Sequence, residues 1–184
     1  GGTHVNGWAI THNDGSGAGN GRGYILSWAV PVQGLLIAWN ETPGSVGASN
    51  AHPELDAVYV ANKSKGVQGK GGENLPQGKP AAPTGVRAAL YEDDAVQVGW
   101  TDAADNEVGF RIERSLDDGK TWTPIAYRPP QIDRSEGNPP VWVDFSAPPG
   151  KGLTYRVVAV DARDGGSASP PTAPVVVPRP AAKR

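Results

Sequence analysis

VQVGW at residues 96–100, GFRIERS at 109–115, TWTPIA at 121–126 and LTYRVVAV at 153–160 decide the fold of the second half of this chain. In each run apolar and polar residues alternate, which is the period of a strand with one buried face. Several such runs separated by turn residues predict a sandwich of two packed sheets. These strands supply a core, but their pattern does not bring reactive side chains together.

Composition and charge agree with an all-β chain and exclude several classes of protein. The 184 residues include 25 Gly and 18 Pro without a long helical period, which favours many short strands joined by turns. The chain has no cysteine, so it has neither a disulfide framework nor a thiolate metal site. A formal net charge of −2 provides no basic face for nucleic acid. No apolar run reaches the roughly 18–20 residues that a membrane span requires.

The composition changes near residue 80 and suggests two halves. Residues 1–79 hold 16 of the 25 Gly but only 4 of the 18 Pro. We predict a Gly-rich β segment at residues 1–65, a linker at 66–79, a sandwich domain at 80–178 and a tail at 179–184. The chain opens Gly1-Gly2-Thr3 without an initiator Met or a signal peptide, so we expect a cleaved, secreted product.

The first half is expected to contain strands near residues 5–11, 24–30, 35–39 and 57–61. Pro31 and Gly34 lie between the second and third of these runs, which predicts a hairpin. Leu35, Leu36 and Ile37 form a continuous apolar run, typical of a strand that is covered on both faces. About four strands make a thin core. We therefore expect this half to lean on the second half, on a partner chain or on a region further upstream.

The second half resembles a known module. DNEVGFRIERS at residues 105–115, DDGKTW at 117–122 and LTYRV at 153–157 are similar to stretches of bacterial fibronectin type III domains. The resemblance covers residues 80–178 and implies a seven-strand sandwich with Trp100 as its buried indole. It also implies that an Asp-Gly pair supplies the positive-φ position of the hairpin turn at 117–120. Tyr155 would then be the tyrosine corner, whose phenol bonds to the backbone.

Most remaining side chains of this half have a structural interpretation. We expect the core to contain Trp100, Phe110, Ile112, Tyr155 and Val157. Arg111, Glu113, Arg114 and Arg156 are expected to form an exposed cross-strand ladder of charges that adds little stability. Trp122 and Trp142 have two interpretations: an aromatic platform that contacts a sugar ring, or indoles that cover a sheet face. The loop at 127–140 is longer than a minimal module needs and is either a contact site or a neutral insertion.

The sequence contains no group of residues with the pattern of a catalytic, cofactor or metal site. His4, His12 and His52 lack the spacing of a zinc site. The glycine-rich stretch at 13–23 contains Asp14, the one candidate calcium ligand, although a flexible connection explains the stretch equally well. We therefore predict no catalytic residue, no cofactor and, apart from this calcium candidate, no metal.

A second resemblance concerns residues 23–61. GYILSW at 23–28 and GLLIAWNE at 34–41 resemble the region that follows the catalytic helix in secreted immune-inhibitor-A-type metallopeptidases. The zinc-binding helix of those enzymes has no counterpart here. The resemblance therefore does not make this chain an enzyme by itself.

Three hypotheses of function follow. The first is a non-catalytic extracellular or cell-surface module that acts as a spacer, adhesion or assembly unit. The second is the C-terminal fragment of a secreted hydrolase, a metallopeptidase or glycoside hydrolase, whose catalytic domain lies upstream. The third is a structural subunit of a surface filament or virion that pairs strands with its neighbours. A protein partner or self-assembly is expected in the first and third cases, and carbohydrate remains an alternative ligand.

Overall fold

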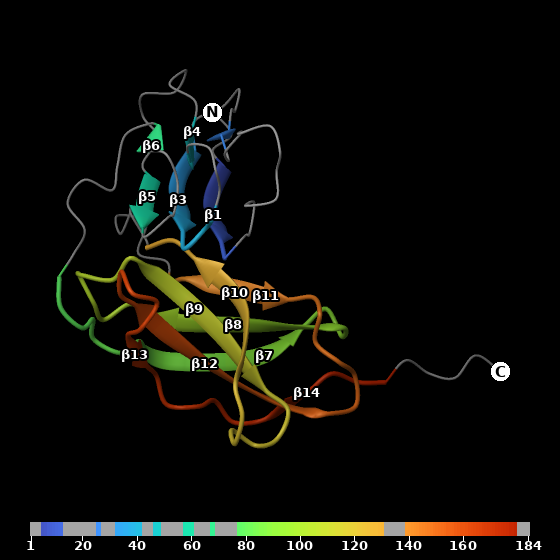
Figure 1. Ribbon diagram of the computed structural model, residues 1–184. Coiled ribbons are helices and arrows are strands. Elements are labelled where there is room, and N and C mark those ends of the chain that lie inside the picture. Colours follow the sequence, from blue (N-terminus) through green and yellow to red (C-terminus); the bar gives the residue numbers. More distant parts are fainter. Residues whose placement is uncertain are drawn as a thin grey trace.

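The computed structural model describes residues 5–12, 25–26, 32–41, 46–48, 57–60, 67–68, 77–130 and 139–179. These residues form strands, turns and irregular segments with no helix among them, which confirms the all-β prediction. The strands fall into two parts: an upright group from the first half, and a sandwich from the second half on which that group stands (Figure 1).

The strand pairs described in the first part are all parallel. One sheet has the order β1-β3-β5 and the other has the order β2-β4-β6. The chain changes sheet at each step, which is the winding of a parallel β-solenoid. Val5 aligns with Val32 and Leu35 aligns with Ala57, so successive layers take 27 and 22 residues. The strand bounds are β1 Val5–Thr11, β2 Ile25–Leu26, β3 Val32–Ala38, β4 Val46–Ala48, β5 Ala57–Val60 and β6 Val67–Gln68.

The predicted hairpin around Pro31 and Gly34 is wrong. β2 and β3 lie in different sheets, and β3 already begins at Val32, so Gly34 lies inside a strand. Local turn residues suggested an antiparallel pair. Parallel neighbours instead need long connections, and here each connection contains a strand of the other sheet.

β3 is the central strand of its sheet and is covered on both faces. Leu36 and Ile37 have no exposed surface, as their apolar run predicted, and neither has Ala38. Leu36 and Ala38 share one face and contact the sandwich, while Ile37 points to the opposite face. Just beyond the strand, the buried Asn40 donates from Nδ2 to the backbone oxygen of Ile10 (3.0 Å). Its amide therefore ties β3 to β1.

The second part is a sandwich of two antiparallel sheets. One sheet has the order β11-β8-β7, and the other has the order β10-β9-β12-β13, with β14 also paired to β12. The chain crosses repeatedly between the sheets, as in a Greek key. The bounds are β7 Thr84–Tyr91, β8 Ala95–Thr101, β9 Gly109–Ser115, β10 Thr123–Arg128, β11 Val141–Asp144, β12 Gly152–Val160, β13 Ser167–Ala168 and β14 Val175–Val176.

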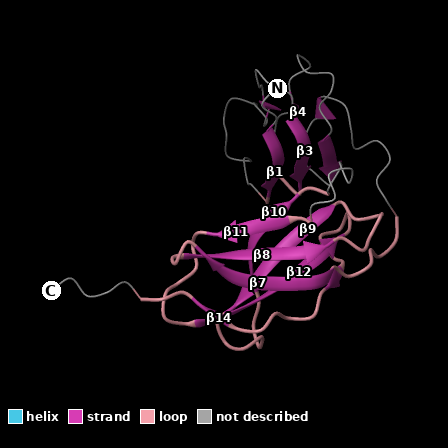
Figure 2. Cartoon of the chain, turned by 180° about the vertical axis from the view of Figure 1, so that it is seen from behind, coloured by secondary structure: helices cyan, strands magenta, loops and turns pink. Residues whose placement is uncertain are grey.

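The core of the sandwich has the residues that the sequence predicted. Alternate positions of β8, β9 and β12 point between the sheets, where their apolar side chains are buried together. Seen from behind, the two sheets cross one another below the first part (Figure 2). The turn between β9 and β10 has positive φ at Asp118 (56°) and Gly119 (82°), as expected for its Asp-Gly pair. The five predicted core residues, all buried, are Trp100, Phe110, Ile112, Tyr155 and Val157.

Tyr155 differs from the expected tyrosine corner. Its hydroxyl donates to Oδ2 of Asp144 at 2.9 Å instead of to the backbone. The same carboxylate oxygen accepts from Nη1 of Arg114 at 2.7 Å, and Asp144 is fully buried. Burial, followed by the Asp144 charge, raises the pKa of Tyr155 well above its ordinary value. These contacts join β9 and β12 of one sheet to β11 of the other.

An apolar contact joins the two parts. Leu36 and Ala38 of β3 pack with Val108, Val158 and Val160, which are all buried. The two valines of β12 lie on the outer face of their sheet, since Val157 and Ala159 point into the sandwich.

Gly109 permits the close approach at this contact. A Cβ there would lie 2.6 Å from the backbone oxygen of Arg128 and 3.0 Å from Cδ2 of Leu36. β6 falls within residues 66–79, the segment expected to be a linker. The division of the chain into domains stays a prediction.

Candidate functional site: the junction between the two parts

The junction begins with the residues that follow β1 and β3. His12 and Trp39 come directly after the paired residues Thr11 and Ala38, so they hold the same position in successive layers. Both have positive φ, 55° for His12 and 52° for Trp39, a conformation that non-glycine residues seldom adopt. Their rings stack with centroids 5.1 Å apart.

Tyr127 of β10 completes an aromatic cluster with these two rings. Its ring centroid lies 5.1 Å from that of His12 and 5.6 Å from that of Trp39. Trp39 also donates from Nε1 to the backbone oxygen of Ala162 (3.2 Å), in the loop after β12. The cluster therefore combines Tyr127 of β10 with His12, which follows β1, and Trp39, which follows β3. These three elements are far apart in the sequence.

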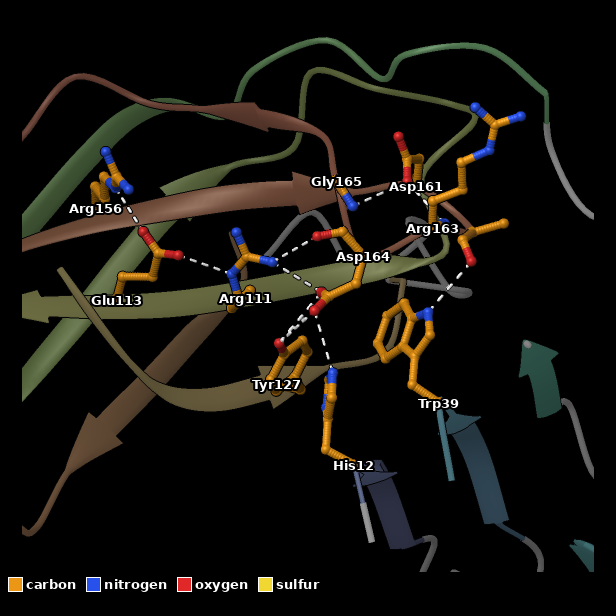
Figure 3. A network of polar contacts seen from close by, with 11 residues as sticks. His12, Trp39, Arg111, Glu113, Tyr127, Arg156, Asp161, Arg163, Asp164 and Gly165 are labelled. Carbon is orange, nitrogen blue, oxygen red and sulfur yellow. Dashed lines mark hydrogen bonds and ion pairs between the residues drawn. The ribbon is translucent and has the colours of Figure 1, made fainter. Parts of the chain in front are cut away.

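Asp164 is the polar centre of the junction (Figure 3). Its Oδ2 accepts from Nε2 of His12 at 3.1 Å, and its Oδ1 accepts from Nη1 of Arg111 at 2.8 Å. The hydroxyl of Tyr127 lies 3.2 Å from both oxygens. Because its oxygens bind His12 of the first part as well as Arg111 and Tyr127 of the second, this carboxylate links the two parts.

The loop that carries Asp164 is shaped by another aspartate. Oδ1 of Asp161 accepts from the backbone nitrogens of Arg163 (2.8 Å) and Gly165 (3.0 Å), as in an Asx turn. Asp164 itself has φ of 60°. The turn thus presents the Asp164 side chain to β9, β10 and the first part.

A row of ion pairs continues from Asp164 across the outer face of the sheet. Arg111 donates from Nε to Oε1 of Glu113 (2.8 Å), and Arg156 donates from Nε to Oε2 of Glu113 (2.6 Å). The guanidinium carbon of Arg156 lies 4.5 Å from the centre of the Trp122 ring, a cation–π contact. Positive and negative charges alternate along the row, so each carboxylate lies beside a guanidinium.

The prediction of an exposed charge ladder is therefore wrong. The side chain of Glu113 is only 5% exposed, and that of Arg111 is 16% exposed. Arg114 belongs to the opposite face of β9, where it pairs with Asp144 between the sheets. The cross-strand pairing was predicted correctly for Arg111, Glu113 and Arg156, but Arg114 was assigned to the wrong face. Burial of the outer face depends on the neighbouring elements, which a strand pattern does not encode.

The surroundings change the pKa values of two groups of the junction. Burial alone would lower the pKa of Arg111, but its hydrogen bond to Glu113 and the charges of Glu113 and Asp164 raise it overall. Arg111 therefore stays charged. Burial, with the Asp164 charge next in importance, raises the pKa of Tyr127 from 10.0 to about 12, because both disfavour the phenolate.

Two grooves border the outer strands. One, of about 560 Å³, lies between β1 and β10 and is lined by Ala9, Thr11, His12, Tyr127, Asp164 and residues 124–126. The other, of about 570 Å³, lies between β10 and β11 and is lined by Ile125, Arg128 and residues 141–146. Ile125 belongs to both, so the grooves adjoin one another at β10.

The residues singled out from the sequence are distributed over several places. Trp122 lies beside the β9–β10 turn under Arg156, whereas Trp142 belongs to β11, packs partly against the core and lines the second groove. A ligand contact by either indole stays a prediction. His12 reaches the junction, while Asp14, His4 and His52 lie outside the described residues. Within the described part of the chain, no group of three or more His, Asp or Glu residues is placed to hold a metal ion.

Trp39, Tyr127 and Asp164 were missed by the sequence reasoning. Trp39 was placed at the end of a strand, and Tyr127 at the start of a loop. No motif connects them, because they are up to 125 residues apart and meet only through the docking of the two parts. The one available signal was that the first half has few strands for a core of its own and was expected to pack against another surface.

Comparison with known proteins reveals similarity to solved structures only. No family model matches the chain, and no curated protein matches it. An Fn3-like protein from Clostridium thermocellum is 23% identical over 58% of this chain and 100% of that chain, with a TM-score of 0.40. The twitchin kinase region from C. elegans is 23% identical over 58% of this chain, with a TM-score of 0.46. A β-1,2-glucanase from Parabacteroides distasonis is 28% identical over 59% of this chain, with a TM-score of 0.45.

The strand order decides the fold of the second part. A three-stranded sheet β7-β8-β11 faces the sheet β10-β9-β12-β13, with the first and second strands paired and the fifth beside the second. The sandwich has a fibronectin type III-like fold. This chain spans only 18% of the twitchin kinase region and 14% of the glucanase. In the described residues, no helix has the length and apolar character to cross a membrane.

Proposed function

We propose that this chain is a non-catalytic, extracellular spacer and assembly unit in which a fibronectin type III-like sandwich holds a parallel β-solenoid segment in a fixed orientation. The observation that carries the proposal is the buried junction between Leu36, Ala38, Val108, Val158 and Val160. Inter-domain contacts that are small and polar normally permit motion. Here an apolar contact is combined with an aromatic cluster and with the hydrogen bond between His12 and Asp164, a combination that resists both sliding and rotation.

The directions of the contacts support this role. Trp39 and Leu36 fix the end of β3, His12 fixes the end of β1, and the β9, β10 and β12 elements receive them. Two neighbouring layers of the solenoid are thus attached at once. A partner that binds either part is then held at a defined distance and angle from a partner that binds the other.

The test compares the orientation of the two parts in solution. Residual dipolar couplings of β1 and β3 should fit the same alignment tensor as those of β8 and β12. Val158→Asp places a charge in the junction, where its burial is strongly unfavourable, but it leaves the sandwich core intact because Val158 faces outward. We expect the variant to need two tensors.

Val176→Asp is the matched control, since Val176 is 51% exposed and lies on β14. It should keep one tensor. Two independent tensors in the unaltered chain would overturn the proposed spacer role.

A further inference from the structure

We infer that the outer edge of β1 is a docking site for one further parallel β-strand, supplied by a protein partner as an uncharged extended segment. The inference deepens the proposed assembly role, since it names the kind of partner that the unit receives. Among the described strands, β1 pairs with β3 on one side and with no strand on the other. A sheet edge of this kind can bind an extended segment through main-chain hydrogen bonds.

The hydrogen bonds at the end of β1 show which backbone groups face outward. The oxygen of Ile10 accepts from Asn40, and the nitrogen of His12 donates to Ala38, so both groups point to β3. In a strand the N–H and C=O of one residue point to the same side, and successive residues alternate. The amide and carbonyl of Ala9 therefore point away from β3, toward the outer edge.

Two strand edges face the groove between β1 and β10, and only one is protected. β10 contains Pro124, which lacks an N–H, and its register to β9 shifts between Pro124 and Ala126, placing Ile125 at an irregularity. Prolines and bulges are the devices with which proteins block strand addition. β1 reads VNGWAIT and has neither a proline nor a charged residue. The unprotected edge is thus β1.

The solenoid itself indicates which strand fits. β3 adds to β1, and β5 adds to β3, both in parallel and without a break in register. A further strand that continues the series lies parallel to β1 at the same spacing. Its side chains on the sandwich side enter the groove, where Ala9, Ile125 and Ala126 offer apolar surface and the polar Asp164 is already bound to Arg111 and His12. An uncharged, largely apolar segment can both pair with the β1 backbone and place its side chains in this groove.

The experiment uses the full chain and a synthetic probe. The probe copies residues 32–40, VQGLLIAWN, because this segment already pairs in parallel with β1, and it carries a solubilising lysine tail. We expect calorimetric binding, and slower hydrogen exchange at the Ala9 amide. A nitroxide at the amino end of the probe should broaden signals near Val5, as the parallel orientation requires.

Ala9→Pro removes the outward N–H while the bonds from β1 to β3 remain, and Ala9→Ser is the matched control that keeps the amide. We expect the proline variant to bind the probe about tenfold more weakly, and the serine variant to bind as the unaltered chain does. Unchanged chemical shifts of β3 and β12 check that Ala9→Pro still folds; if those shifts change, a probe with proline in place of its central leucine provides the same comparison.

Three results would overturn the inference: no binding to the unaltered chain at millimolar probe, equal binding to all variants, or broadening near Thr11 instead of Val5. The outcome is separable from the test of the spacer role. Probe binding to a chain whose parts reorient freely would retain the docking site and reject the spacer. A chain with one alignment tensor that does not bind the probe would retain the spacer role and reject the docking site.

Discussion

At the scale of single residues, carboxylates organise the described turns and contacts. Asp144 joins the two sheets through Arg114 and Tyr155, and Asp164 joins the two parts of the chain. Asp117 shapes the β9–β10 turn, where its oxygens accept from the backbone of Thr121 (2.9 Å) and the hydroxyl of Ser115 (2.7 Å). In each case one carboxylate accepts hydrogen bonds from several donors.

The turn around Asp117 predicts an acid-sensitive hairpin. The backbone hydrogen bond from Thr121, and then those from the Ser115 and Thr121 hydroxyls, lower the pKa of Asp117 from 3.8 to about 2. A lowered folded-state pKa stabilises the fold above the unfolded-state value, and this contribution disappears as the pH falls through the folded-state value. We expect the loss between about pH 4 and pH 2, measured by carboxyl NMR titration together with unfolding in denaturant.

Asp117→Asn should remove this dependence on pH. Asp118→Asn is the matched control: the substitution is at the adjacent position, whose φ of 56° asparagine tolerates. The control should retain the acid-dependent loss. An Asp117 carboxyl that titrates near 4 in the folded chain would contradict the account.

At the scale of the elements, the strand pattern predicted the core of the sandwich but not the pairing of the strands in the first part. In the sandwich, alternation predicted which residues of β8, β9 and β12 point into the core. In the first part, β1 and β3 were found with nearly correct bounds, but their partners were not. An antiparallel hairpin is encoded by its turn, whereas a parallel pair is encoded by residues a full layer apart, for which a single sequence offers little signal.

Asn40 is expected to stabilise the parallel layers. It is 1% exposed and donates to Ile10 across the gap between β3 and β1. Asn40→Ala removes this partner from the half-buried backbone oxygen of Ile10, at a cost of about 1–3 kcal/mol. Hydrogen exchange of β1 and β3 should accelerate, while that of β8 and β12 should not change.

Asn106→Ala provides the comparison on the surface. Asn106 donates from Nδ2 to the backbone oxygen of Gln77 at 3.0 Å, the same kind of bond in an exposed position. Water can replace this bond, so its loss should leave exchange in β1 and β3 as it was. Equal effects of the two substitutions would show that burial of Asn40 is unimportant.

At the scale of the whole molecule, the junction decides how the chain behaves. It combines an apolar contact and an aromatic cluster that belong to neither part alone with the Asp164 carboxylate of the second part, which binds His12 of the first. The fibronectin type III-like fold of the sandwich follows from its own strands. The orientation of the solenoid strands follows from Leu36, Trp39 and His12, which dock onto the outer face of β9, β10 and β12.

Alkaline conditions should loosen this junction. The pKa of Tyr127 is raised to about 12, mainly by burial and then by the Asp164 charge. A raised folded-state pKa means that its stabilising contribution is complete below the unfolded-state value near 10 and disappears as the pH rises to about 12. Site-resolved NMR of the phenol carbon should show the late titration, and the dipolar couplings should diverge in the same range.

Tyr127→Phe should abolish the alkaline divergence of the two alignment tensors, because it has no proton to lose. Tyr91→Phe, a substitution on β7 away from the junction, should leave the alkaline divergence of the tensors unchanged. Titration of Tyr127 near 10 would contradict the environment that the structure gives it.

The sequence by itself determined the all-β class, the strands of the sandwich, its buried Trp100 and Tyr155, and the positive-φ turn at Gly119. Those features depend on residues near one another in the chain, or on a strict alternation along a strand. Only the tertiary structure decided the parallel winding of the first part, the burial of Glu113 and the meeting of His12, Trp39, Tyr127 and Asp164. The physical reason is that burial and register are set by the elements that pack against a strand, and these elements are distant from it in the sequence.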